Sequence, residues 1–145
     1  MAHRIEIKVR GYHCDHFGHV NNARYIELLE EARWSLFEEQ AAPNFFEQEG
    51  GAVFVVVNIN VNYRRPAVLR DVLRIESGVC RVGRSSGVVR QEVFNQRGEP
   101  VADAEVTFAL FDPATARSRP LSPTMRQTLE RMRDERGGPA GAGAT

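Results

Sequence analysis

The chain opens with a stretch in which apolar and polar residues alternate. Ile5, Ile7 and Val9 fall on one side of an extended backbone, and charged residues stand between them. A period of two is typical of a half-buried β-strand, because successive side chains point to opposite faces. We therefore predict a strand over residues 4–12, followed by a polar loop that ends near residue 22.

The next stretch has the spacing of a helix. Its apolar residues recur at intervals of three and four, which places them on one helical face; they are Tyr25, Leu28, Leu29, Ala32 and Leu36. Asn21 or Asn22 can cap this helix, because an amide oxygen can accept hydrogen bonds from the first free backbone N–H groups. Pro43 limits its far end, so we predict a helix over residues 22–40.

Four more strands and a short helix follow. The strand over residues 53–64 alternates most regularly, with apolar residues at the odd positions from Val53 to Tyr63 and asparagines between them. The other strands are predicted over residues 71–82, 86–96 and 101–112, and the last two are joined by a hairpin containing Gly98. Ser122 followed by Pro123 is typical of a helix start.

This order of elements predicts an α+β protein in which one long helix packs on a five-stranded antiparallel sheet. We expect residues 1–136 to form a single domain. Residues 137–145 are almost all glycine and alanine, which cannot build a core, so we expect a flexible tail.

Composition excludes several function classes. The 145 residues include 19 Lys+Arg and 19 Asp+Glu, so no excess of positive charge is available to attract nucleic acid. No apolar run reaches the roughly 20 residues of a membrane helix, and the N-terminus lacks a secretory apolar segment. The two cysteines, Cys14 and Cys80, cannot form a disulfide framework. We therefore expect a cytoplasmic protein with no nucleic-acid or membrane partner.

Candidate chemistry concentrates in the loop before the long helix. The loop and the helix start hold six polar residues: His13, Asp15, His16, His19, Asn21 and Asn22. In one interpretation Asp15 acts as general base or nucleophile, and free N–H groups at the helix start stabilise an oxyanion. In another, the histidines and Asp15 bind a metal ion, although their spacing matches no standard zinc motif. In a third, these residues only satisfy loop and cap hydrogen bonds. Residue types alone leave all three open.

A resemblance changes this balance. The segment from Val9 to Tyr25, with Asp15-His16-Phe17-Gly18-His19-Val20-Asn21-Asn22 at its core, resembles the signature of the 4-hydroxybenzoyl-CoA thioesterase family. A second segment, residues 54–67, is similar to the long-chain acyl-CoA thioesterases of that family.

The resemblance implies a hotdog fold, in which a curved antiparallel sheet wraps a long central helix. It also implies hydrolysis of a medium- or long-chain acyl-CoA without cofactor or metal. The subunits would form a homodimer, or a homotetramer built from it, with active sites at the dimer interface.

The resemblance also assigns roles to residues. Asp15 would be the catalytic carboxylate, and the backbone N–H of Asn22 would polarise the thioester carbonyl. Asn21 and His19 would complete the catalytic loop. The substrate would be bound by Phe17 and Tyr25 on the acyl side, and by Arg64, Arg84, Ser85 and Ser86 on the coenzyme A side.

Some alternatives remain open on sequence grounds. A non-catalytic acyl-CoA or acyl-carrier binding protein on the same fold would need Asp15 only as a structural residue. Arg84 and its neighbouring serines would equally suit a solvated turn. Arg64 suits the subunit interface or a structural role better than the coenzyme A site. Trp34 and Phe37 are expected in the core or an interface, and Glu30 on a solvated helix face, with Glu31 a distant second candidate for the catalytic carboxylate.

Overall fold

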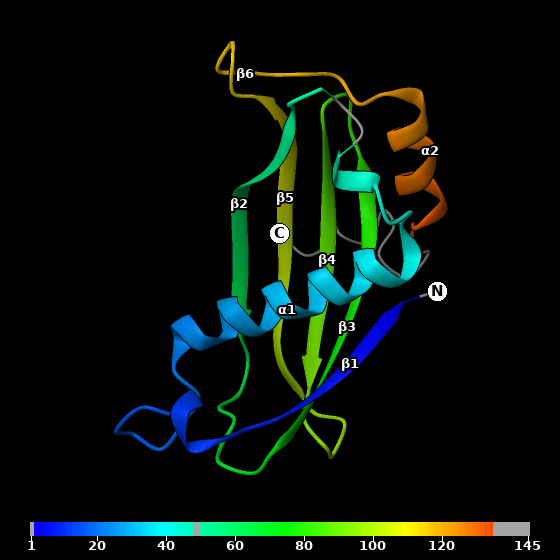
Figure 1. The fold of residues 1–145 in the computed structure, drawn as a ribbon. Coiled ribbons are helices and arrows are strands. Elements are labelled where there is room, and N and C mark those ends of the chain that lie inside the picture. The colour runs from blue at the N-terminus through cyan, green and yellow to red at the C-terminus, as the bar shows by residue number, and fades with distance from the viewer. Residues whose placement is uncertain (1, 48–49, 135–145) are drawn as a thin grey trace.

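In the computed structural model, which describes residues 2–47 and 50–134, one long helix lies across one face of an antiparallel sheet (Figure 1). The helix, α1, spans Asn22–Gln40, as predicted. The sheet has the strand order β1-β3-β4-β5-β2, and the short β6 pairs with β5. The strands are β1 (His3–Lys8), β2 (Val53–Tyr63), β3 (Val72–Val82), β4 (Ser86–Phe94), β5 (Pro100–Asp112) and β6 (Arg117–Ser118). The predicted α+β hotdog arrangement is confirmed, with the two-residue β6 as a sixth strand that the sequence did not indicate.

The first strand is shorter than predicted. It ends at Lys8, and Gly11–His13 form a 3-10 turn instead of continuing the strand to residue 12. Val9 is buried, and its N–H donates to the carbonyl of Asp71 at 2.8 Å, so the alternating pattern outlasts the regular strand by one residue. The chain then turns away from the sheet into the polar loop.

β2 departs from strict alternation. Its pairing with β5 shifts between Val56 and Asn58, so Val57 is the extra residue of a bulge. A bulge inverts the faces of the residues on either side of it. Phe54 and Val61 therefore both pack toward the core although they are seven residues apart. The predicted apolar face of odd-numbered residues is wrong for the part of the strand before the bulge.

The core has two parts under the two halves of α1. Tyr25, Leu29 and Ala32 pack against one end of strands β3, β4 and β5, while Leu36 and Phe37 pack against the other end of these strands and against α2. Leu36 is completely buried, and full burial of a leucine side chain contributes roughly 1.5–3 kcal/mol.

The C-terminal helix α2 (Pro123–Arg131) begins where predicted. Ser122 Oγ accepts a hydrogen bond from the N–H of Met125 at 3.1 Å, and Met125 and Leu129 are completely buried in the second part of the core. The predicted tail at residues 137–145 lies outside the described residues. Within the described part of the chain, no helix has the length and apolar character needed to cross a bilayer.

Candidate active site

The loop before α1 is closed by backbone hydrogen bonds. The N–H of Asp15 donates to the carbonyl of His19 at 3.0 Å, and the N–H of Gly18 donates to the carbonyl of Asp15 at 2.9 Å. Gly18 has a φ of +80°, a left-handed conformation that glycine adopts without steric cost. The N–H of Val20 donates to the carbonyl of Ala67 at 2.9 Å, which fixes the loop to the segment between β2 and β3. These contacts hold Asp15 at a defined place beside the helix start.

The carboxylate of Asp15 is oriented by two hydrogen bonds. Its Oδ1 accepts from the N–H of Phe17 at 3.0 Å, and its Oδ2 accepts from Asn21 Nδ2 at 3.4 Å. The other side-chain atom of this amide, Asn21 Oδ1, accepts from the N–H of Ala23 at 2.9 Å. Asn21 therefore caps α1, as predicted, and holds Asp15 against the helix N-terminus.

The backbone N–H of Asn22 lies at the start of α1. The first N–H groups of a helix have no acceptor within the helix and carry partial positive charge. Asn21 accepts from the N–H groups of both Ala23 and Arg24. Within the described residues, no oxygen accepts from the N–H of Asn22. An open depression next to it is lined by Tyr12, Cys14, Asp15, Asn21, Ala23, Arg24, Ile26 and Glu27.

The histidines have separate places. His13 is buried, and its Nδ1 accepts from the N–H of Arg10 at 2.9 Å. Burial lowers the pKa of His13, and the nearby charges of Arg24 and Arg10 add to this effect. His16 is exposed with its ring 4.0 Å from that of Phe17, and His19 is exposed and contributes its carbonyl to the loop. Among the described residues, no three His, Cys, Asp or Glu side chains gather closely enough to bind a metal ion.

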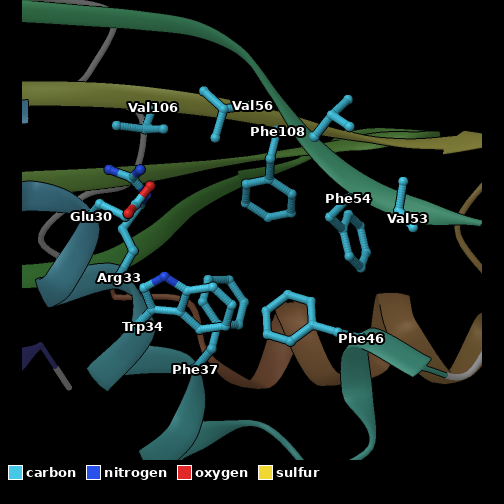
Figure 2. A pocket seen from close by; sticks show the side chains of 11 residues that line it. Glu30, Arg33, Trp34, Phe37, Phe46, Val53, Phe54, Val56, Val106 and Phe108 are labelled. Atoms are coloured by element: carbon cyan, nitrogen blue, oxygen red, sulfur yellow. The ribbon is translucent and has the colours of Figure 1, made fainter. Parts of the chain in front are cut away.

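A second hollow lies between the later half of α1 and the strands β2 and β5. Its volume is about 360 Å³. Figure 2 shows phenylalanine side chains from both layers, together with Trp34 of α1, pointing toward this space. Its lining is Glu30, Arg33, Trp34, Phe37, Phe46, Val53, Phe54, Val55, Val56, Val106 and Phe108. We call this hollow the aromatic pocket.

Comparison with known proteins identifies the family. Residues 9–129 match the model of the Thioesterase-like superfamily. The chain belongs to this superfamily. It is 47% identical over 130 residues to the long-chain acyl-CoA thioesterase FadM of Escherichia coli K12, which covers 89% of this chain and 98% of FadM. It is 29% identical over 118 residues to the acyl-CoA thioester hydrolase YbgC of Escherichia coli O6:H1, covering 81% of this chain and 88% of YbgC.

Solved structures give the same result. The probable thioesterase YbaW of Escherichia coli has a TM-score of 0.81 and 45% identity, covering 90% of this chain and 98% of YbaW. SAV2348 of Staphylococcus aureus, solved in complex with CoA, has a TM-score of 0.80 over 91% of this chain and 84% of its own. Its 13% identity makes it a likeness of fold alone. The predicted family and the predicted class, a thioester hydrolase, are confirmed.

In this member of the thioesterase-like superfamily, the predicted acyl-side residues separate. Phe17 lies beside Asp15 and is 72% exposed. Tyr25 is 4% exposed, its ring lies 5.4 Å from that of Tyr63, and burial raises its pKa to about 12. Tyr25 points into the core and does not line the depression around Asp15, so within one chain it supports the helix start instead of meeting a ligand there.

The predicted coenzyme A residues of this thioesterase-like chain lie at two separate places. Arg64 Nε donates to Asp103 Oδ2 at 2.7 Å across β2 and β5. Arg84, Ser85 and Ser86 lie at the turn between β3 and β4, and Figure 1 shows this turn and the loop before α1 at opposite ends of the sheet. The strand between them, β3, has 11 residues and spans about 35 Å. Within one chain the turn at Arg84 is therefore separated from Asp15. Arg64, in contrast, directly follows Tyr63, whose hydroxyl donates to the carbonyl of Asn22 at 2.9 Å, so it lies at the same end of the sheet as the start of α1.

Sequence reasoning missed the aromatic pocket of this thioesterase-like chain. Trp34 and Phe37 were expected in the core or an interface; Phe37 is indeed buried, but both residues line the pocket, and Trp34 is 54% exposed. The available signal was the run Phe45-Phe46 together with Phe54 and Phe108. Phe46, Phe54 and Phe108 line one space, and Phe54 does so because the bulge in β2 turns it inward.

Proposed function

We propose that this chain hydrolyses acyl-CoA thioesters to a free acid and coenzyme A, with Asp15 as the catalytic carboxylate. The observation that carries the proposal is the joint geometry of Asp15 and the start of α1. Asn21 holds the carboxylate beside the helix N-terminus, where the Asn22 N–H has no acceptor within the described residues. The 47% identity to FadM over nearly all of that protein supports the same activity.

The chemistry follows from these groups. The thioester oxygen accepts a hydrogen bond from the Asn22 N–H, so the developing negative charge lies at the positive end of α1. The Asp15 carboxylate then either attacks the carbonyl carbon or removes a proton from an attacking water. Attack by Asp15 gives a mixed anhydride and expels the coenzyme A thiolate, and water then cleaves the anhydride. Attack by water expels the thiolate directly.

The aromatic pocket is our proposed site for the acyl chain. Apart from Glu30 and Arg33 its lining is apolar, and each methylene removed from water contributes about 0.8 kcal/mol. The pocket begins two helical turns beyond the start of α1, roughly 12 Å from Asn22 to Glu30 along the axis. This supports a medium- or long-chain acyl group over a short one.

We further propose that the working form in the cytoplasm is a homodimer, or a homotetramer built from it. β2 is at the end of the strand order and exposes Val56, Val57 and Ile59. Pairing of two β2 edges would continue the sheet through both subunits. A second copy would also provide a way to bring the turn holding Arg84 close to Asp15 of its neighbour.

The deciding experiment measures free thiol release from acyl-CoA esters ranging from acetyl to palmitoyl, with benzoyl-CoA included. We expect turnover that survives a chelator and favours longer chains. Asp15→Asn should lower kcat by at least about a hundredfold, in the range of lost acid–base or nucleophilic catalysis. Glu31→Gln, which alters an exposed carboxylate of α1, is the matched control and should retain wild-type turnover.

The rival function is an acyl-CoA or acyl-carrier binding protein on the same fold. In that case no ester in the panel is turned over, a long-chain acyl-CoA still binds, and Asp15→Asn leaves its affinity unchanged. That combination of results would replace the hydrolase proposal.

A further inference from the structure

Two charged side chains stand in the wall of the aromatic pocket. Glu30 and Arg33 are three residues apart on α1, so they lie on the same side of the helix. Figure 2 shows them at the same end of the pocket, near Val106. The remaining lining residues are all aromatic residues or valines. A charged group in such a wall is costly unless it has a polar partner.

Arg33 is positioned by a hydrogen bond to a neutral side chain, Gln91. Its Nη1 donates to Oε1 of Gln91 at 3.1 Å, and Gln91 is completely buried. Gln91 Nε2 in turn donates to the carbonyl of Leu29 at 3.0 Å and to Ser77 Oγ at 2.9 Å. Because Nε2 is committed to these two acceptors, Oε1 must face Arg33. The guanidinium is therefore fixed in position at the pocket wall.

The guanidinium has no ion-pair partner in the described part of the chain. Burial lowers the pKa of Arg33, and the negative charge of Glu30 offsets this only in part. No ion pair joins the Arg33 and Glu30 side chains. An arginine has five N–H donors, and Gln91 uses only one of them. The pocket wall thus presents free hydrogen-bond donors from Arg33 beside the carboxylate acceptor of Glu30.

We propose that Arg33 and Glu30 recognise a hydroxyl group on the acyl chain, which makes a hydroxyacyl-CoA the preferred substrate. A hydroxyl can accept from Arg33 and donate to Glu30 at the same time. A methylene would leave the Glu30 carboxylate and the remaining donors of Arg33 without a hydrogen bond from the ligand, and a second carboxylate would be repelled by Glu30. This inference rests on the proposed function, because it requires the acyl chain to enter the aromatic pocket.

The expected selectivity is moderate. A site that hydrogen-bonds a substrate hydroxyl can reject the analogue lacking it by several orders of magnitude when the site is dry. Glu30 is exposed in this chain, so water can replace part of the lost hydrogen bonding. We therefore expect a preference of about tenfold or more in kcat/KM.

The test compares acyl-CoA esters of equal chain length. One ester has no hydroxyl group, and each of the others carries a single hydroxyl group at one position between carbon 3 and the chain end. For wild type, one region of the chain should show the preference. Arg33→Met and Glu30→Gln should each bring the kcat/KM ratio of hydroxylated to plain substrate close to one, while plain esters are still hydrolysed. Arg33→Lys, which keeps a donor, should retain part of the preference. Arg131→Met, at the exposed end of α2, should leave the ratio unchanged.

The outcomes separate the inference from the function. Hydrolysis of plain esters that depends on Asp15, with a ratio near one at every hydroxyl position, overturns the inference and leaves the function standing. A ratio that survives Arg33→Met also overturns it, because then Arg33 acts only on the fold. Absence of turnover with every ester refutes the proposed function, and the inference fails with it.

Discussion

At the scale of single residues, Asn21 links stability to chemistry. Its two side-chain atoms serve different groups, since Oδ1 caps α1 at Ala23 and Nδ2 contacts Asp15. The sequence could identify Asp15, Asn21 and Asn22 as candidates because they are contiguous in one loop, and local hydrogen bonds among neighbours decide their geometry. It could not show that one amide does both tasks, since either asparagine was an acceptable cap.

Two substitutions of Asn21 separate these tasks. Asn21→Ala removes the cap and the contact to Asp15, so it should cost about 1 kcal/mol in the free energy of unfolding and also lower kcat. Asn21→Asp keeps an oxygen that can cap the helix but loses the donor to Asp15, so it should keep most of the stability and still lower kcat. Urea unfolding and steady-state kinetics on both variants check this. Wild-type kcat in Asn21→Asp would show that the contact to Asp15 is dispensable.

Arg64 gives a pH-dependent prediction. Burial would raise the pKa of Asp103, but hydrogen bonds from Arg64 and Asn62 outweigh it, and the pKa is lowered overall. A lowered folded-state pKa means that the contact stabilises the protein above the ordinary carboxyl pKa of about 4, and that this contribution is lost as the pH falls through the folded value.

Arg64→Met should therefore lower the melting temperature by at most a few degrees at pH 7, because the arginine is exposed and screened by water. The difference from wild type should shrink as the pH falls below about 4. Thermal unfolding from pH 7 to pH 3 measures it, with Arg117→Met on β6 as the control. A difference that stays constant or grows in acid would contradict this account of Asp103.

At the scale of elements, the order and type of the strands and helices were predictable, but the faces of β2 were not. Alternation of valines and asparagines identifies a strand, because a period of two fits no helix. The bulge at Val57 leaves no separate mark in a run of consecutive valines, yet it decides whether Phe54 faces the core. The aromatic pocket depends on that inversion, which explains why its lining could not be predicted.

The packing of α1 on the sheet also contains a contact that the sequence does not predict. The apolar face of the helix was predicted correctly, but Gln91 lies in the middle of β4 and gives no sign in sequence that it is completely buried. Its hydrogen bonds to Leu29 and Ser77 tie the helix to the strands. A buried amide is tolerated because its polar atoms have partners, and leaving such atoms unpaired costs about 1–3 kcal/mol for each group.

At the scale of the whole molecule, the two edges of the sheet are unequal. β1 forms one edge and carries alternating charged residues, whereas β2 forms the other and exposes several valines together with Ile59. Apolar side chains on an open strand edge favour pairing with another chain, and a charge on such an edge opposes it. The separation of Asp15 from the turn at Arg84 adds a functional reason for a second copy.

Val57→Lys tests whether two chains pair through their β2 edges. Val57 is 57% exposed, so a lysine there can reach water and should leave the fold of one chain intact. We expect the variant to be monomeric by light scattering, with a circular dichroism spectrum like that of wild type. Its kcat/KM for a long-chain acyl-CoA should fall by at least about tenfold, because binding energy lost from a remote part of the substrate also lowers the rate. Glu6→Lys places the same charge on the opposite edge, β1, and should change neither mass nor activity. A monomeric Val57→Lys with full activity would show that each chain carries a complete site, and that the turn at Arg84 serves the fold alone.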